Sequence, residues 1–100
     1  MKTLKKVEIE PIYVHYMPHV TEMEQGKLYI SKEFEVANHL CLCGCGEQTV
    51  TPIYKEIAGE KGWELIEHDN GKISLTPSIG NYQFPCKSHY IITKNVANFV

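Results

Sequence analysis

The sequence predicts a mainly β fold: one small domain over residues 1–100, built of short antiparallel strands and hairpins and stapled by zinc. Apolar residues recur at every second position in several short runs, which is the period of a half-buried strand. All four cysteines fall into two compact clusters, and no part of the chain is low in complexity or repeated. One hundred residues correspond to one domain. A core of that size is modest, so a metal cross-link would contribute much of the stability.

The first half of the chain is expected to be extended. Short runs rich in strand-forming residues, some with strict alternation of apolar and charged side chains, occur at 7–10, 13–16, 28–30 and 34–37. Residues 39–43 would carry a strand into a glycine turn, and residues 47–51 would carry the next strand away from it. Alternate residues of an extended segment share a face.

The second half is expected to form hairpins. Residues 64–68 and 72–75 flank Asn70-Gly71, which favours the left-handed conformations of a type I′ turn. A closing hairpin is expected from 90–93 and 96–99 around Lys94-Asn95. The stretch from Ile53 to Ala58 is the one candidate for a helical turn. Trp63 is expected in the core.

Two cysteine-containing segments predict a single metal site. Cys41, Cys43 and Cys45 alternate along a turn that contains two glycines, and Cys86 and His89 lie three positions apart. A tetrahedral Zn²⁺ takes thiolate and imidazole ligands, commonly two from each of two tight turns. Two of the first three cysteines, together with Cys86 and His89, would give a closed Cys₃His site. Spacing alone does not select which two.

His39 extends the list of candidates, because it could complete the ligand set or donate a hydrogen bond to a thiolate from outside it. Disulfides are a less favoured use of the cysteines. The N-terminus is basic and lacks the apolar run of a signal peptide, which predicts a cytoplasmic, reducing environment. No apolar run approaches the length that spans a bilayer. The net charge of −2 argues against a nucleic-acid surface.

A family resemblance follows from several motifs: Cys-x-Cys-Gly-Cys-Gly at 41–46, Pro52, Trp63, Asn70-Gly71, Leu-x-Pro-Ser-Ile-Gly-Asn at 75–81 and Cys-x-Ser-His-Tyr at 86–90. Over about residues 36–100 the chain resembles a bacterial family of small cysteine-rich proteins described as metal-binding. Some members are encoded beside ubiquitin-like proteins and E1-like adenylyltransferases. The resemblance implies a zinc-binding accessory of a ubiquitin-like conjugation system, with those proteins as partners. The chain departs from it at Ile91 and at Lys94-Asn95.

Three classes of function remain open, and the favoured one is a structural zinc module that binds a protein partner without being an enzyme. A zinc hydrolase or deaminase is the first alternative, with Glu47 as base, but the chain lacks the motifs of both. A thiol redox or metal-transfer protein is the second. Ser78, Asn81 and Ser88 are expected to hydrogen-bond the backbone or thiolates. Without a Gly-x-Ser-x-Gly motif, no serine nucleophile is expected.

Overall fold

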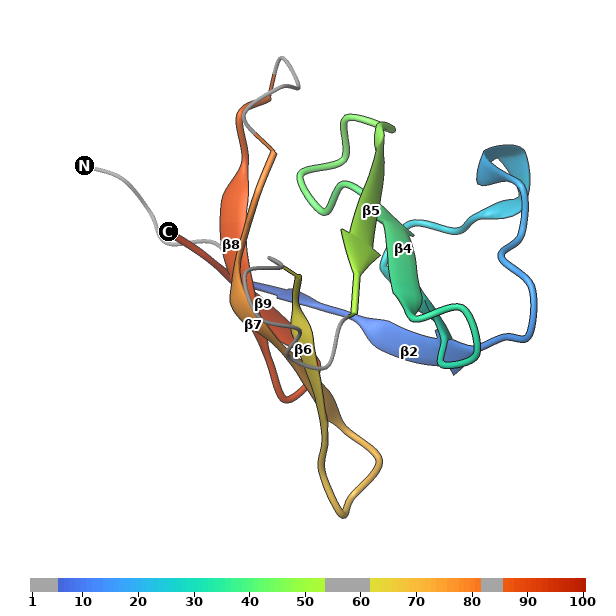
Figure 1. The fold of residues 1–100 in the computed structure, drawn as a ribbon. Helices are drawn as coiled ribbons and strands as arrows, with labels where there is room; N and C mark the ends of the chain where they lie inside the picture. The colour runs from blue at the N-terminus through green and yellow to red at the C-terminus, as the bar shows by residue number, and fades with distance from the viewer. Residues whose placement is uncertain (1–5, 54–61, 82–85) are drawn as a thin grey trace.

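The computed structural model describes residues 6–53, 62–81 and 86–100, and in these residues the chain forms two β-sheets (Figure 1). The five-stranded sheet has the order β1 (Lys6–Glu8), β9 (Val96–Phe99), β8 (His89–Thr93), β7 (Ile73–Gly80), β6 (Glu64–Glu67). The four-stranded sheet has the order β2 (Glu10–Tyr13), β3 (Lys27–Ser31), β4 (Val36–Leu40), β5 (Gln48–Pro52). The mainly β prediction is therefore confirmed.

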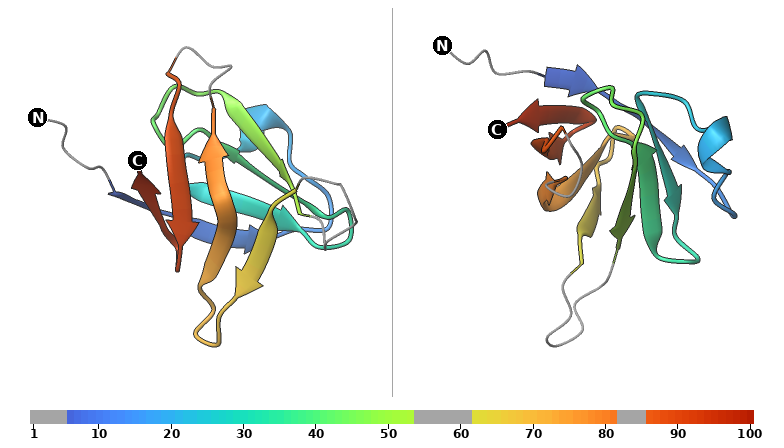
Figure 2. Two further views of the ribbon diagram at one scale, coloured as in Figure 1. Left: turned by 60° about the vertical axis from the view of Figure 1, so that its left-hand side comes forward. Right: turned by 90° about the horizontal axis from the view of Figure 1, so that it is seen from above.

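The core lies between the two sheets. Figure 2 shows the arrangement of these sheets from two directions. Strand alternation sends one set of side chains from each sheet into it. Its buried members come from both sheets, from the loop after β4 and from two positions next to strand ends, Ile9 and Ile53: Ile9, Leu28, Ile30, Ala37, Cys41, Leu42, Ile53, Ile73, Leu75, Ile79, Tyr90, Ile92 and Ala97. Trp63 packs against this cluster and is partly buried. Cys41 is completely buried, so the cysteine-containing loop is part of the packing that joins the sheets.

One strand pair departs from the antiparallel pattern. β2 runs parallel to β3, whereas the other six strand pairs are antiparallel. Parallel neighbours need a crossover connection of a dozen or more residues. The segment between them supplies it, with a 3₁₀ turn η1 (Val20–Glu22). The extended conformation expected over 13–16 accordingly ends at Tyr13, where the crossover begins.

The turn before β4 also moves an expected boundary. Residues 32–35 form a turn, with Glu35 at φ 55°, so the strand begins at Val36 instead of residue 34. The expected helical turn at 53–58 lies outside the described residues, apart from Ile53. Within the described parts of the chain, no helix is long and apolar enough to cross a membrane.

The two expected hairpins exist, but the type I′ turn predicted at Asn70-Gly71 is found at Lys94-Asn95 instead. Gly71 has φ 81° whereas Asn70 does not have a positive φ, and the Gly71 amide donates to the His68 carbonyl at 3.1 Å. This pattern matches a three-residue loop with a left-handed glycine bulge, not a type I′ turn. Lys94 and Asn95 both have positive φ, 47° and 65°, and thus form the type I′ turn.

Strand β7 contains the irregularity that shapes the functional site. Leu75 pairs with Ile92 and Ile79 pairs with Tyr90, so four residues of β7 span two residues of β8. The extra residues form a bulge that includes Pro77, and proline, which has no amide hydrogen, is tolerated in sheets at such positions. Beyond the bulge, the alternation places Ile79 inside the core and Ser78 on the outer face.

Candidate functional site

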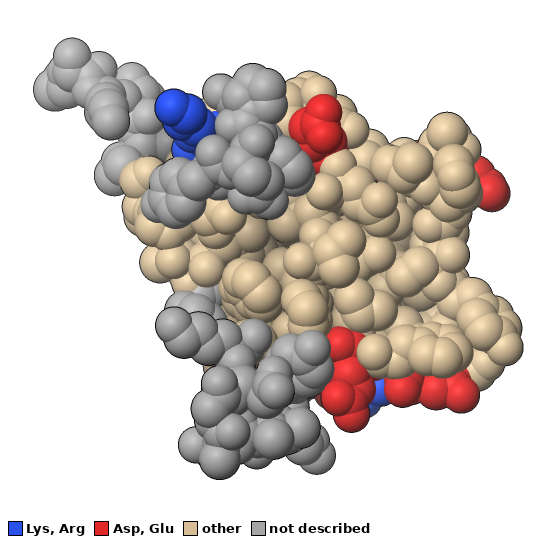
Figure 3. Space-filling view, turned by 45° about the horizontal axis from the view of Figure 1, so that its top comes forward, with Lys and Arg blue, Asp and Glu red and all other residues tan. Residues whose placement is uncertain are grey.

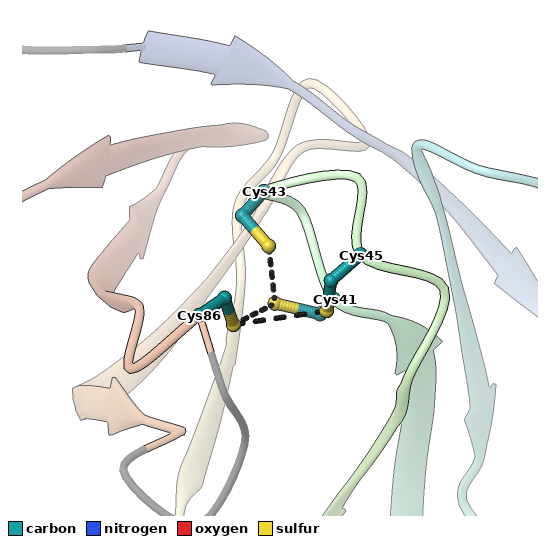
Figure 4. A group of neighbouring side chains, drawn as sticks. All are labelled: Cys41, Cys43, Cys45 and Cys86. Atoms are coloured by element: carbon teal, nitrogen blue, oxygen red, sulfur yellow. Dashed lines mark hydrogen bonds between the residues drawn. The ribbon is translucent and has the colours of Figure 1, made fainter.

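The glycine turn between β4 and β5 brings three cysteines to the start of β8. Gly44 and Gly46 have φ of 92° and 85°, which lets the chain reverse within a few residues, as the sequence predicts. Cys86 approaches from the other sheet. Figure 4 shows the four side chains of Cys41, Cys43, Cys45 and Cys86, with their sulfur atoms directed toward one another.

The geometry of this thiol cluster suits a tetrahedral metal. All four sulfur atoms lie within 4.8 Å of one another. The Sγ of Cys41 is 3.4 Å from that of Cys43 and 3.7 Å from that of Cys86, and Cys45 and Cys86 are also 3.7 Å apart. Four thiolates at the usual Zn–S length would be about 3.8 Å apart. All four cysteines are free. The cluster could therefore hold a metal ion.

Two buried polar side chains surround Cys41. The Oγ of Ser88 lies 3.0 Å from the Cys41 sulfur and 3.5 Å from the Cys86 sulfur. The Nδ2 of Asn81 donates to Ser88 Oγ at 3.1 Å and lies 3.5 Å from the Cys41 sulfur. Because Ser88 Oγ already accepts from Asn81, its own hydrogen is available for a sulfur atom. The hydrogen bond with Ser88 is also the main cause that lowers the pKa of the Cys86 thiol to about 6.

The same asparagine connects the thiol cluster to a buried histidine. Asn81 Nδ2 also donates to the Tyr90 hydroxyl at 3.2 Å, and Tyr90 Oη lies 2.6 Å from His39 Nε2. His39 is 1% exposed, and burial lowers its pKa to about 4. It is thus neutral near pH 7, with its Nδ1 left without a hydrogen-bond partner among the described residues. His39 is not part of the thiol cluster.

His89 is not part of the thiol cluster and is paired with a serine instead. Its Nε2 lies 2.6 Å from the Oγ of Ser78, a hydrogen bond between β8 and the bulged part of β7. The two side chains are half-buried on the outer face of the five-stranded sheet, whereas the adjacent Tyr90 and Ser88 point inward. The indole of Trp63 donates to the Ser78 carbonyl at 3.2 Å and holds the bulge from the β6 side. A hydroxyl paired with an imidazole is the arrangement of an activated nucleophile.

The other serines of the chain are engaged differently. Ser31 Oγ donates to the His15 carbonyl and is fully buried, and Ser88 belongs to the surroundings of the thiol cluster. Ser74 also meets an imidazole, at 2.8 Å from His68 Nε2, but it is 5% exposed and its Oγ accepts the Lys94 amide. Of the four serines, Ser78 alone combines an imidazole partner with an accessible position.

Taken together, the fold and the site define a small two-sheet β protein with a thiol cluster at one end and a serine–histidine pair on its outer face. A family model described as bacterial ubiquitination-like system serine protease (BubE) matches residues 13–100, and the chain belongs to this family. No curated protein and no solved structure matches the chain. The resemblance implied an association with a bacterial ubiquitin-like system, and this association is confirmed at the level of the family.

The expectation that the chain is not an enzyme is wrong, because its family is described as one of serine proteases. The absence of Gly-x-Ser-x-Gly was a poor guide, since that motif belongs to one fold and the serine–histidine arrangement recurs on others. Ser78 and His89 are eleven residues apart, and the bulge that makes them meet leaves little trace in the sequence beyond Pro77. The available signal was a serine after a strand proline, with a histidine at the start of the next strand.

Proposed function

We propose that this protein is a serine peptidase of a bacterial ubiquitin-like system, with Ser78 as nucleophile and His89 as its general base. The observation that carries the proposal is the 2.6 Å contact between His89 Nε2 and Ser78 Oγ on an accessible face. Ubiquitin-like and E1-like proteins are the partners that we propose for it, and a protein of that system is its substrate.

The chemistry follows from the two groups. The neutral imidazole accepts the Ser78 proton at Nε2 while the oxygen attacks the carbonyl carbon of an amide bond. An acyl-enzyme forms when the protonated His89 gives this proton to the departing amine, and water then releases the acyl group by the same steps in reverse order. For His89 to accept at Nε2, its own proton must reside on Nδ1.

We further propose that the thiol cluster binds one structural Zn²⁺ through Cys41, Cys43, Cys45 and Cys86. This set differs from the predicted Cys₃His set, because His89 is paired with Ser78 and the fourth thiol would take the remaining tetrahedral position. Four thiolates leave no open position for a substrate water, so the metal would hold the loop and not act as a Lewis acid. Cys86 is three residues before His89, and the zinc would thereby fix the start of β8.

The test is hydrolysis of the ubiquitin-like protein of the same system, produced with a short C-terminal extension, by purified variants. Ser78→Ala and His89→Gln are expected to reduce kcat/KM at least 10³-fold, as loss of a nucleophile or its base does. Each variant should bind the same amount of metal as the wild type.

The chain provides its own matched control in the second serine–histidine pair. Ser74→Ala and His68→Gln remove the same groups from a second pair, whose serine is buried in the same sheet, and they are expected to leave kcat/KM within threefold. Equal losses at both pairs would point to a general effect on the sheet. Full activity in Ser78→Ala would refute the assignment.

A further inference from the structure

An exposed group of aromatic side chains lies at the end of the four-stranded sheet, on a part of the molecule that the serine–histidine pair does not use. Tyr13, Tyr16 and Phe34 are 48%, 71% and 55% exposed. The rings of Tyr16 and Phe34 lie 5.6 Å apart, and His15 stands edge-on to Tyr16 at 4.3 Å. We define the aromatic patch as Tyr16 and Phe34, whose rings are neighbours, together with Tyr13, which lies three residues before Tyr16. Isolated exposed apolar residues are ordinary, but a contiguous group usually marks an interaction surface.

The backbone beneath the patch is fixed. The Val14 amide donates to the Ile30 carbonyl at 2.9 Å, and Ser31 Oγ donates to the His15 carbonyl at 3.1 Å. The Phe34 amide in turn donates to Ser31 Oγ at 3.3 Å. The aromatic side chains are thus presented by an ordered frame, so little entropy is lost when a partner orders them further. Tyrosine and phenylalanine are favoured at the centres of interfaces for this reason.

The surroundings of the patch are acidic. Glu33 contacts the Nδ1 of His15 at 2.5 Å and is about half exposed, and Glu35 is exposed in the same turn. Glu67 accepts a hydrogen bond from Tyr13 at 2.8 Å and pairs with Lys32 at 3.0 Å. Near the patch the chain thus carries three carboxylates, of which Glu67 pairs with Lys32 and Glu33 with His15. Acidic side chains also gather along the lower margin of the face in Figure 3.

One edge of the patch adjoins the sheet that carries the serine–histidine pair. Glu67, which joins Tyr13 to β6, pairs with Ile73 at the start of β7. Ser78 is five residues further along the same strand, which is at most about 17 Å. A folded domain of about 100 residues has a radius of gyration near 13 Å. A small protein that covers the Glu67 edge of the patch needs an extended chain end of about five residues to span the length from Ile73 to Ser78.

We propose that the aromatic patch is the docking surface for the folded body of the protein substrate, and that the matching face of that substrate is apolar at its centre and carries lysine or arginine at its rim. The negative charge of the rim determines which partner is preferred. Carboxylates around exposed aromatic rings complement lysine and arginine, and these basic side chains also pack on such rings. The inference rests on the proposed peptidase function and names how its substrate is held.

The first arm of the test measures binding and does not need catalysis. Calorimetry is performed with the Ser78→Ala protein and, as probe, the ubiquitin-like protein of the same system. Adding Tyr16→Ala and Phe34→Ala is expected to weaken binding at least tenfold. Glu33→Gln with Glu35→Gln is expected to weaken it severalfold at 50 mM salt but not at 0.5 M salt, where surface charges are screened. Val50→Ala, which alters another exposed apolar residue, is the control and should have no effect.

The second arm separates docking from chemistry. In the active protein, Tyr16→Ala/Phe34→Ala should raise KM for the protein substrate at least tenfold and leave the hydrolysis of a short peptide unchanged.

If the wild type cleaves neither substrate, the peptidase proposal fails while the binding arm still decides the docking surface. Unaltered affinity in both patch variants overturns the inference. So does a wild-type dimer that becomes a monomer in the patch variant, because the occupant would then be a second copy of this chain. Thermal melts confirm folding, with Tyr16→Ala alone as the milder variant.

Discussion

The hydrogen bonds around Tyr90 form a chain in which each donor and acceptor can be assigned. Thr49 donates to Asn81 Oδ1, and Asn81 Nδ2 donates to the Tyr90 hydroxyl. The Tyr90 hydrogen is then available for His39 Nε2, which requires the imidazole to carry its proton on Nδ1. Buried networks of this kind are valuable when complete and costly when broken. The phenol of Tyr90 thus bonds two buried side chains, those of Asn81 and His39.

Tyr90→Phe is therefore expected to lower the free energy of unfolding by about 1–3 kcal/mol, because His39 would be left with both ring nitrogens unpaired. Urea unfolding of the metal-loaded protein measures the change. Tyr16→Phe removes an equivalent hydroxyl from a 71% exposed ring and should change stability by less than about 0.5 kcal/mol. Similar values for the two variants would show that the buried hydroxyl contributes nothing.

At the scale of the elements, the two hairpins show what local sequence determines and what it leaves open. Asn70-Gly71 marks a turn correctly, but one further loop residue changes its type. Lys94-Asn95, a less favourable pair, adopts the type I′ turn because other strands hold it. The Asn95 carbonyl accepts from Ile9, and its amide and Oδ1 both bond to Ile73. Tertiary contacts outside the hairpin thus decide the turn.

Gly71→Ala is expected to destabilise the protein by about 1 kcal/mol, because alanine disfavours a φ of 81°. A Cβ at this position would meet no atom within 4 Å, so backbone strain is the whole effect. Thermal unfolding measures it against Asp69→Ala in the same loop, for which a change below about 0.5 kcal/mol is expected. An unchanged melting temperature in Gly71→Ala would argue against the left-handed bulge.

The features of this protein that could be predicted from its sequence are those with local patterns. Alternation located most strands, and paired cysteine spacing located the thiol cluster. The position of His89 could not be derived in this way, since Cys-x-x-His spacing fits a metal ligand equally well. Only strand alternation after Lys87, with Ser88 inward and His89 outward, separates it from the sulfur atoms. The parallel pairing of β2 and β3 could not be predicted from the sequence either, because pairing across a crossover depends on distant residues.

For the molecule as a whole, the thiol cluster connects the β4–β5 turn of one sheet to the start of β8 in the other. A metal there closes a loop of about forty residues and stabilises the fold by restricting the unfolded chain. One Zn²⁺ per chain is expected by elemental analysis of protein purified without added metal. Cys86→Ser should lose most of the metal and melt at least 10 °C lower.

His89→Gln supplies the matching contrast, because it should retain the full metal content and nearly the wild-type melting temperature. X-ray absorption should report four sulfur neighbours and no nitrogen. Loss of zinc in His89→Gln, or a three-sulfur, one-nitrogen shell, would restore the Cys₃His set and remove His89 from the proposed catalytic pair.

The assignment of Ser78 and His89 is tested most directly by labelling with a serine-directed fluorophosphonate, followed by peptide mapping. This reagent reacts with activated serine hydroxyls and needs no knowledge of the substrate. The account predicts one adduct per chain, on Ser78, abolished in His89→Gln and undiminished in His68→Gln. An adduct on Ser74 or another serine, or labelling of Ser78 that persists without His89, would contradict it.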